Sequence, residues 1–562
     1  MEYPLYHIGD TLAAILAGHG IERAVVSPGS RNSTLIAAIA KSKKIRTKAV
    51  IDERCAAFVA LGMSMTSRKP VCLICTSGTA LLNYAPAVAE AYYRKIPLIV
   101  ISADRPIEWI DQDDSQTIRQ PNALSNIVKR SYDIPVVNEK SDQWYANRLI
   151  NDAILNCTYD IPGPVHINIQ VGADSLGNAN TCVSSQQRIV SSFAPQACMT
   201  ISESRQIGAQ IASPRKIMVI VGFMAPDPIL NKALNKLAGL DNFVVLTETI
   251  SNLHGQNFVD SIDSVLSCLP KDYSSYVPDV VISAGGAIVS RHIKDFLRHS
   301  SGVEHWHISD SDKITDCFMS ITKSIRMQPG VFFRQLASAM QIHKTSCNYS
   351  FIWEVLRNKA RAHLQSFIAK THWCDIKAFA TMLPLIPRHW NIHYSNGTSI
   401  RYAQLFGDGK FHQCECNRGV SGIDGCTSTA IGASLEYNDV TLLITGDMSA
   451  QYDIGALAIR DIPTRFKMIV ICNGGGGIFR FINSTSKLPI LDEYLCADPH
   501  IPLRQLADGY GFKYLEASSE NDLREIFPLF IKEMMHPVIL AIHTDGTLSA
   551  NILENYFNYN NQ

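Results

Sequence analysis

Two polar residues, Asp447 and Asn473, each follow an apolar run that is typical of a buried strand. TLLITG ends directly before Asp447, and KMIVIC ends directly before Asn473. Their separation fits one strand–helix–strand crossover, which would place both side chains at neighbouring strand ends. Carboxylate and amide oxygens suit Mg²⁺ held with a phosphate group, and the glycine run 474–477 would let the backbone approach that phosphate. A tight Gly-Asp turn followed by a helix cap is the alternative explanation.

A third candidate, Glu53, stands at the start of a predicted helix in VIDERCAAFVALGMS. The face of this helix is rich in Ala, Phe, Val and Leu. A carboxylate beside such a face loses part of its hydration, which suits a role in proton transfer. For this residue in isolation, a first-turn glutamate stabilised by the helix dipole is the simpler explanation.

Other constrained polar turns also follow predicted strands, where open α/β sheets bind their ligands. They are SPGSRNS (27–33), TSGTALLN (76–83), SADRP (102–106), SAGGAIVSRH (283–292), SNGTSIR (395–401), CNRGVSGIDG (416–425), TGDMSAQYD (445–453) and CNGGGGIF (472–479). Most of them lie in the first and last parts of the chain, where we therefore expect the functional residues. Signatures of P-loop and Rossmann nucleotide sites, zinc metalloproteases and α/β-hydrolases are absent from the sequence.

The composition narrows the class of protein. The chain has 562 residues, and 51 Lys and Arg balance 51 Asp and Glu, which removes the usual electrostatic basis for binding nucleic acid or a membrane surface. Because no secretory signal or membrane-length apolar stretch is present, we expect a soluble, cytoplasmic protein without membrane insertion. The scattered cysteines are typical of reduced, buried thiols. Neither Cys72 with Cys75 nor Cys414 with Cys416, near His412, predicts a redox or zinc site.

The elements that position these turns repeat one pattern, a short apolar run followed by a turn and a helical stretch. The predicted strands are 24–27, 71–75, 98–103, 165–170, 216–222, 243–248, 279–285, 305–309, 441–446, 467–472 and 538–543. Such runs indicate parallel sheets covered on both faces. Helices are predicted at 11–20 and 351–383. With linkers at 174–200 and 342–350, the sequence predicts an α/β fold of three doubly wound parallel-sheet domains, 1–175, 195–345 and 351–562.

Glu53 and the Gly446-Asp447…Asn473 pattern together resemble the thiamine-diphosphate enzymes, which hold their cofactor between a pyrimidine-side domain and a diphosphate-side domain. Further motifs are similar to the branch of 2-succinyl-5-enolpyruvyl-6-hydroxy-3-cyclohexene-1-carboxylate synthases, which act in menaquinone biosynthesis. They are SPGSRNS, DERCAAFVALG, TSGTALLNYAPAVAEA, SADRP, SQTIRQP, NRGVSGIDG, GDMSAQYD and the GIF after the glycine run. The similarity extends from about Ser27 to Phe479 and is weak in the middle.

The resemblance implies a transferase that decarboxylates 2-oxoglutarate and adds the resulting carbanion to isochorismate. It implies thiamine diphosphate and Mg²⁺ or Mn²⁺ as cofactors, and a homodimer or homotetramer with active sites between subunits. The first domain would be the pyrimidine-side domain, 195–345 a central domain, and 351–562 the diphosphate and metal domain. The thiamine ring acts as the electron sink in such chemistry.

The resemblance also assigns roles to individual residues. Glu53 would hydrogen-bond the cofactor's aminopyrimidine ring and promote loss of the thiazolium proton. The metal would be held by Asp447, Asn473 and the Gly475 carbonyl. Further cofactor contacts would come from Thr79, Ile423, Met448, Ser449 and Ile478. The carboxylate-rich substrates would meet Ser30, Arg31, Arg105, Gln116, Arg291, Arg401, Arg418, Ile478 and Phe479, of which Arg31, Gln116, Arg401 and Arg418 would also act in catalysis.

Several positions depart from the family pattern. Met448 stands where the family commonly has Gly, and one Asn follows the second strand where many members have two. Gly397 replaces a serine, so its hydroxyl contact is lost or supplied by Thr398 or Ser399. His292 replaces the second cation of a Lys-Arg pair and is only partly charged at neutral pH.

Two other functions remain open at this point. One is an acetolactate-synthase-like 2-oxo-acid ligase or decarboxylase, and the other is a catalytically dead binding protein on the same fold. Arg119 also lies in a matching motif, but a structural ion pair explains it equally well, so we assign it no role.

Overall fold

The computed structural model describes residues 7–172, 187–212, 214–340, 347–407, 411, 413–482 and 484–558. Residues 174–186 and 342–346 of the predicted linkers, and His412, lie outside this set. The chain divides into two compact units. The first comprises Met1–Ala194, Gly419–Thr441 and Tyr452–Phe466, and the second comprises Pro195–Arg418, Leu442–Gln451 and Lys467–Gln562. The predicted boundaries of the three domains stay a prediction.

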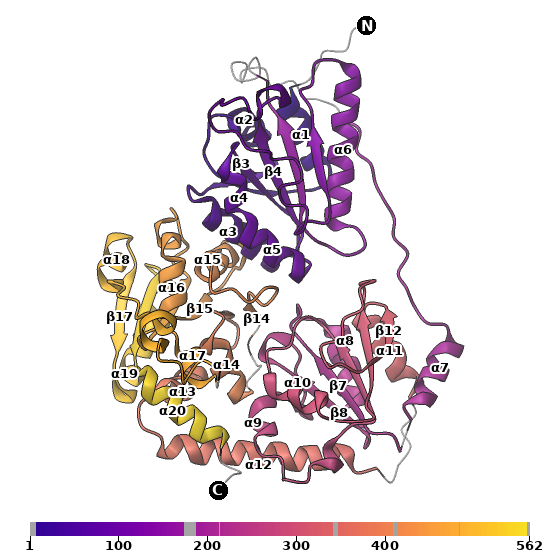
Figure 1. The fold of residues 1–562 in the computed structure, drawn as a ribbon, viewed down its shortest axis with the longest axis vertical. Coiled ribbons are helices and arrows are strands. Elements are labelled where there is room, and N and C mark those ends of the chain that lie inside the picture. Colours follow the sequence, from indigo (N-terminus) through magenta and orange to yellow (C-terminus); the bar gives the residue numbers. More distant parts are fainter. Residues whose placement is uncertain are drawn as a thin grey trace. The chain divides into compact units, whose positions relative to one another are not determined.

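The first unit contains a six-stranded parallel sheet in the order β2-β1-β3-β4-β6-β5, drawn in indigo and violet in Figure 1. Its strands are β1 (Arg23–Val26), β2 (Arg46–Ala49), β3 (Val71–Cys75), β4 (Leu98–Asp104), β5 (Ser131–Ile134) and β6 (Val165–Gln170). Its helices are α1 (Ile8–Gly18), α2 (Ser33–Lys41), α3 (Glu53–Ser67), α4 (Thr79–Asn83), α5 (Ala85–Arg94) and α6 (Lys140–Thr158).

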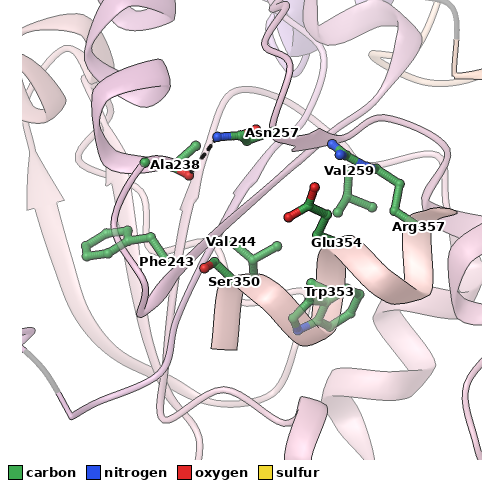
Figure 2. Close-up of a pocket in the computed structure, with 10 residues that line it drawn as sticks. Ala238, Phe243, Val244, Asn257, Val259, Ser350, Trp353, Glu354 and Arg357 are labelled. Carbon is green, nitrogen blue, oxygen red and sulfur yellow. Dashed lines mark hydrogen bonds between the residues drawn. The ribbon is translucent and has the colours of Figure 1, made fainter. Parts of the chain in front are cut away.

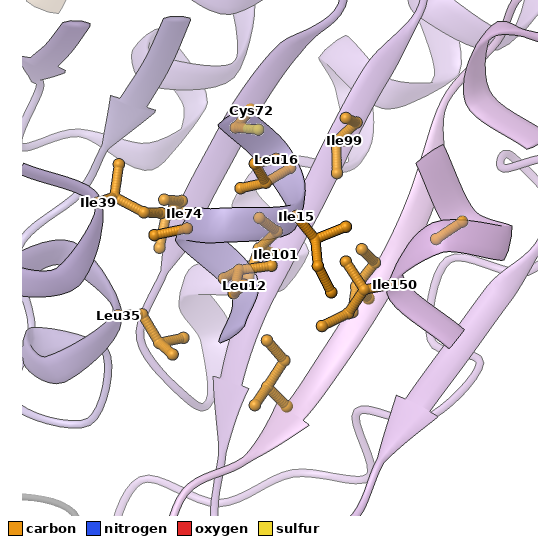
Figure 3. Packing of buried hydrophobic residues seen from close by; sticks show 14 of the residues in the cluster. Leu12, Ile15, Leu16, Leu35, Ile39, Cys72, Ile74, Ile99, Ile101 and Ile150 are labelled. Atoms are coloured by element: carbon orange, nitrogen blue, oxygen red, sulfur yellow. The ribbon is translucent and has the colours of Figure 1, made fainter. Parts of the chain in front are cut away.

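One face of this sheet is covered by α1, α2 and α6. Leu12 of α1, Ile39 of α2 and Ile150 of α6 pack on Ile74 and Ile101 of the sheet, all of them buried (Figure 3). Burying such side chains from water contributes roughly 1.5–3 kcal/mol each. The inner strands β3, β4 and β6 are buried along their whole length, as their uninterrupted apolar runs predict.

The second unit contains two six-stranded sheets, in the orders β12-β11-β10-β7-β8-β9 and β14-β13-β15-β16-β18-β17. The strands are β7 (Ile217–Val221), β8 (Phe243–Thr247), β9 (Phe258–Val259), β10 (Val280–Ala284), β11 (Glu304–Ser309), β12 (Ile321–Arg326), β13 (Asn391–Tyr394), β14 (Gln413–Cys416), β15 (Thr441–Gly446), β16 (Phe466–Cys472), β17 (Lys513–Ala517) and β18 (Val538–His543). Thr441 and Phe466, where β15 and β16 begin, belong to the first unit. Three six-stranded sheets with helices between their strands confirm the predicted α/β fold class.

The remaining helices alternate with the strands along the chain. They are α7 (Ile201–Gln210), α8 (Pro228–Leu237), α9 (Ile262–Leu266), α10 (Arg291–Arg298), α11 (Pro329–Ala339), α12 (Tyr349–Lys370), α13 (Asp375–Met382), α14 (Thr398–Phe406), α15 (Cys426–Glu436), α16 (Asp447–Tyr452), α17 (Gly477–Phe481), α18 (Leu503–Gly509), α19 (Glu520–Lys532) and α20 (Gly546–Phe557). The prediction of one helix over 351–383 is wrong, because Thr371 turns extended after α12 and its hydroxyl bonds the Phe367 carbonyl at 2.7 Å.

Candidate active site

Glu53 opens helix α3 in the first unit. Asp52 caps this helix, because its carboxylate accepts a hydrogen bond from the Cys55 N–H at 3.1 Å. The half-buried Glu53 carboxylate has no hydrogen bond or ion pair within the described part of the chain. It lies close enough to Cys75 that it adds to burial in raising the pKa of that thiol. Glu53 is thus held on a rigid helix with its carboxylate open to a ligand.

Helix α3 crosses α15 at very short distance, and both belong to the first unit. A Cβ at Gly62 would lie 1.9 Å from the Thr429 carbonyl oxygen, and one at Gly432 would lie 2.0 Å from the Val59 oxygen. Only glycine permits this approach. A Cβ at Gly425 would overlap Phe58 at 2.1 Å, so the turn that carries Ile423 also packs on α3.

The polar turns that follow the strands of the first sheet pack against one another. A Cβ at Gly29 would lie 2.2 Å from Thr76, so the turn with Ser30 and Arg31 packs on the turn that leads to Thr79. Gln116 has a left-handed backbone (φ 61°) and lies against Gly78. Sequence reasoning misses Gln120, a buried side chain that accepts from the Gly78 N–H at 2.7 Å and fixes this arrangement.

Arg31 and Arg105 are neighbours in the first unit. Burial and the charge of Arg105 lower the pKa of Arg31, whose Nη1 donates to the Val171 carbonyl at 3.3 Å. Arg105 pairs with Asp114. Arg119 is exposed and pairs with Asp111 at 2.7 Å, which agrees with a structural ion pair.

Asp447 is buried in the second unit, at the end of β15, and the loop after β16 wraps around it. Its Oδ2 accepts the N–H groups of Asn473, Gly474 and Gly475, each at 3.0 Å, and its Oδ1 accepts from Met448 at 2.8 Å. Gly474 and Gly475 have φ of 84° and 75°, which favours glycine. Burial raises the pKa of Asp447, although these N–H groups oppose that effect.

The side-chain amide of Asn473 is oriented by a hydrogen bond to Asp375. Its Nδ2 donates to Asp375 at 2.8 Å, which leaves its Oδ1 as the atom that can bind a cation. Asp447, Asn473 Oδ1 and the Gly475 carbonyl thus offer the oxygen donors that Mg²⁺ prefers. Sequence reasoning misses Asp375, because its only signal is an acidic residue at a helix start. Within the described residues, no cluster of three or more His, Cys, Asp or Glu forms a metal site of another kind.

Helix α14, which carries Arg401, begins beside this loop. A Cβ at Gly477 would touch Thr398 at 3.6 Å, and the Gly446 N–H donates to Ser395 Oγ at 3.4 Å. Gly397 has φ 99°, a backbone conformation that favours glycine. The buried Ser399 hydroxyl lies 3.4 Å from that of Ser395.

Three predicted arginines gather in the second unit. Burial, followed by the charges of Arg418 and Arg291, lowers the pKa of Arg401. Arg418 Nη1 donates to Asn396 Oδ1 at 3.1 Å. Asp263 also lies in this cluster, 3.5 Å from His292. Burial is the largest single effect and lowers the pKa of His292, but Asp263 and Asp295 together outweigh it and raise that pKa overall. His292 therefore replaces part of the positive charge of the missing Lys or Arg.

A buried acidic residue, Glu248, supports the loop before Arg291. Its carboxylate accepts from the Val289 N–H at 2.9 Å and the Ser290 N–H at 2.8 Å. Burial raises the pKa of Glu248 to about 7. Sequence reasoning misses both Glu248 and Asp263, since neither belongs to a motif.

The remaining predicted residues lie on two short helices of the second unit. Ser449 is buried and Met448 half-buried in α16, while Ile478 and Phe479 are half-buried in α17. Ser30, Arg31, Glu53, Thr79, Arg105, Gln116 and Ile423 belong to the first unit, and the other predicted residues belong to the second.

A cavity of about 110 Å³ lies elsewhere in the second unit, between the β8–β9 edge and α12 (Figure 2). Trp353, Glu354 and Arg357 of α12 line it, and Asn257 donates to the Ala238 carbonyl at 3.4 Å. It contains none of the predicted site residues. Along the described residues, no helix has both the length and the apolar character needed to cross a membrane.

Comparisons with known proteins agree with the geometry. Residues 6–124 match the family described as "Thiamine pyrophosphate enzyme, N-terminal TPP binding domain", which uses another name for thiamine diphosphate. Proteins named 2-succinyl-5-enolpyruvyl-6-hydroxy-3-cyclohexene-1-carboxylate synthase are similar over nearly their full length. That of Porphyromonas gingivalis is 36% identical over 96% of this chain and 95% of its own. That of Flavobacterium johnsoniae is 36% identical over 99% of both chains, and that of Christiangramia forsetii is 35% identical over 100% of both.

Proposed function

This chain belongs to the 2-succinyl-5-enolpyruvyl-6-hydroxy-3-cyclohexene-1-carboxylate synthases of the thiamine pyrophosphate enzyme family, and we propose that it joins 2-oxoglutarate to isochorismate with loss of CO₂. It is a transferase, and its product would enter menaquinone biosynthesis. The observation that carries the proposal is the helix α14, which brings Arg401 and its arginine neighbours beside the loop around Asp447.

The arginine clusters fit these substrates. The two acids bring four carboxylates between them, and guanidinium groups bind carboxylates through paired hydrogen bonds. Arg31 and Arg105 would hold one part of the substrates, and Arg291, Arg401 and Arg418 another. Ser30 and Gln116 would add polar contacts, while Ile478 and Phe479 would exclude water. An enzyme for pyruvate has no need of so many cations, which disfavours the acetolactate-synthase-like alternative.

The oxygen donors of the second unit fit a divalent metal and a diphosphate. Asp447, Asn473 and the Gly475 carbonyl would hold Mg²⁺ or Mn²⁺, and Met448 and Ser449 would contact the cofactor. When bound, thiamine diphosphate supplies an electron sink for the decarboxylation. These intact donors also disfavour a catalytically dead protein.

Glu53 would hydrogen-bond the aminopyrimidine ring and favour its imino tautomer, since its carboxylate is open and held at a helix start. Thr79 and Ile423 would help to fix that ring. The pyrimidine-side domain would be 1–175, the central domain 195–345, and the diphosphate and metal domain 351–562. The active unit would be a cytoplasmic homodimer or homotetramer with sites between subunits.

The choice of the first substrate tests this proposal. Purified protein with thiamine diphosphate and Mg²⁺ should release CO₂ from 2-oxoglutarate and much less from pyruvate. A strong preference for pyruvate would favour the acetolactate-like reaction instead. Sedimentation should show at least a dimer in the active sample, and full activity from a monomer would contradict the assembly.

A further inference from the structure

Asp375, at the start of α13, is an almost completely buried carboxylate, with 1% of the residue exposed. Each of its oxygens has a different donor. Oδ1 accepts from the Thr544 hydroxyl at 2.6 Å, and Oδ2 accepts from Asn473 Nδ2 at 2.8 Å. Its backbone N–H donates to Ser549 Oγ at 3.0 Å. The carboxylate is therefore held in one orientation by segments far apart in the chain.

The hydrogen bond to Asn473 decides which end of that amide faces the metal site. An amide has a donor end and an acceptor end, and only its oxygen can ligate a cation. An ionised carboxylate accepts hydrogen bonds and cannot donate them. Asp375 therefore requires Nδ2 of Asn473 on its own side and turns Oδ1 away from itself.

We propose that Asp375 is a positioning residue that fixes the amide of Asn473 with its oxygen toward the divalent metal. This inference rests on the proposed function, because it assumes that Asn473 is a metal ligand. Groups that orient the ligands of a metal commonly change its affinity 10- to 100-fold when they are replaced. Asp375 also lies near Asp447, so its negative charge would favour a cation held there.

A purely structural role for Asp375 is the competing explanation. Through Thr544 and Ser549, the same residue ties α13 to the start of α20. A structural role predicts loss of folding stability with unchanged metal affinity. A positioning role predicts weaker metal binding in a protein that remains folded.

Mn²⁺ binding to the full-length protein with thiamine diphosphate separates the two explanations, with free Mn²⁺ measured by electron paramagnetic resonance. Asp375→Asn keeps the size of the side chain but can present either end of an amide to Asn473. We expect its Mn²⁺ dissociation constant to rise about 10- to 100-fold. Thr544→Val is the matched control, because it removes the hydrogen bond to Oδ1 and leaves the one to Oδ2. It should bind Mn²⁺ as the unchanged protein does.

A reversed pair tests the orientation itself. In the double variant Asp375→Asn with Asn473→Asp, the new amide can donate to the new carboxylate, which keeps one oxygen for the metal. The double variant should recover most of the roughly 10- to 100-fold affinity that the single variant loses. Thermal unfolding without metal and cofactor shows whether each variant is folded.

Two results would overturn the inference. If folded Asp375→Asn binds Mn²⁺ normally while Asn473→Ala binds it weakly, Asn473 is a ligand but Asp375 does not position it. If Asn473→Ala also binds Mn²⁺ normally, the proposed metal site is itself wrong.

Discussion

The Oδ2 atom of Asp447 accepts a hydrogen bond from the Asn473 backbone N–H at 3.0 Å, across a sequence separation of 26 residues. The bond closes the crossover between β15 and β16 at the edge where both strands end. It places the two predicted metal ligands side by side and fixes the glycine loop around them. The residues predicted for the diphosphate and metal half of the site thus lie together within the second unit.

Replacing Asp447 should abolish cofactor-dependent stabilisation. A ligand at 100 times its dissociation constant stabilises the folded state by about 2.7 kcal/mol. Asp447→Asn lacks the negative charge for the cation, so thiamine diphosphate with Mg²⁺ should no longer raise its unfolding temperature. Unfolding without ligands serves as the control for folding, and an undiminished shift in the folded variant would remove Asp447 from the metal site.

Replacing Glu53 should stop proton loss from the cofactor and leave the fold intact. Glu53→Gln keeps the size of the side chain, and the Asp52 cap of α3 is untouched. Exchange of the thiazolium proton, followed by NMR after mixing with D₂O, should slow by orders of magnitude. Exchange at the unchanged rate would refute the role assigned to Glu53.

Replacing Arg401 should weaken substrate binding. Arg401→Lys keeps the charge but loses the planar fork that pairs with a carboxylate. Hydrogen bonds to charged groups contribute about 1.5–3 kcal/mol, so the KM for the substrate concerned should rise about 10- to 100-fold. Arg119→Lys is the matched control, because Arg119 is exposed and pairs with Asp111. An equal effect of both variants would argue against the cluster.

Replacing Gly62 should destabilise the crossing of α3 with α15. The new methyl group would lie 1.9 Å from the Thr429 oxygen, so the helices must move apart. Such overpacking costs about 1–3 kcal/mol. Gly509→Ala in α18 is the control, since a Cβ there meets nothing within 4 Å. Chemical denaturation should show a loss for Gly62→Ala alone, and equal stability of the two variants would contradict the close crossing.

Stability should fall in mild acid because of buried histidines. Burial lowers the pKa of His166 to about 4, as it does for His305 with help from His307. In the unfolded chain these histidines take up protons as the pH falls below about 6.5, whereas in the folded chain they do so only near pH 4. The contribution of the neutral histidines to the free energy of unfolding is therefore complete above about pH 6.5 and is lost as the pH falls toward 4. Each histidine should cost about 2 kcal/mol between pH 7 and 5.

Single replacements isolate the contribution of His166 from that of other titrating groups. His166→Asn should flatten the pH dependence of the free energy of unfolding by that amount. His536→Asn, at a side chain that is 60% exposed, should leave it unchanged. Identical pH profiles for all three proteins would contradict the prediction.

The sequence predicts every inner strand of the three sheets except β13 and misses every edge strand. β2, β5, β9, β12, β14 and β17 stand at the ends of the strand orders, where one side has no neighbouring strand. β2 reads RTKA and β12 reads ITKSIR, because an edge strand contacts water and carries polar residues. Continuous apolar runs mark only strands that are covered on all sides. The inner strand β13, NIHY, is missed because its buried Asn391 and His393 interrupt the apolar pattern.

The sequence nominates the motif residues of the candidate site, but it does not reveal the residues that hold them in place. Asp447 and Asn473 follow strands that can be recognised in the sequence as continuous apolar runs. Asp375 stands 98 residues before Asn473 and touches it only because α13 folds back onto the loop. Glu248 binds backbone N–H groups of Val289 and Ser290, and Asp263 lies beside His292. These partners are distant in the sequence, so the contacts leave no local pattern that could be recognised.

Product analysis tests the central claim most directly. The protein is mixed with thiamine diphosphate, Mg²⁺, 2-oxoglutarate and isochorismate, and the products are identified by mass spectrometry. The account predicts release of CO₂ together with 2-succinyl-5-enolpyruvyl-6-hydroxy-3-cyclohexene-1-carboxylate, and neither product with Asp447→Asn. Unchanged isochorismate in the presence of active, cofactor-loaded protein would contradict it.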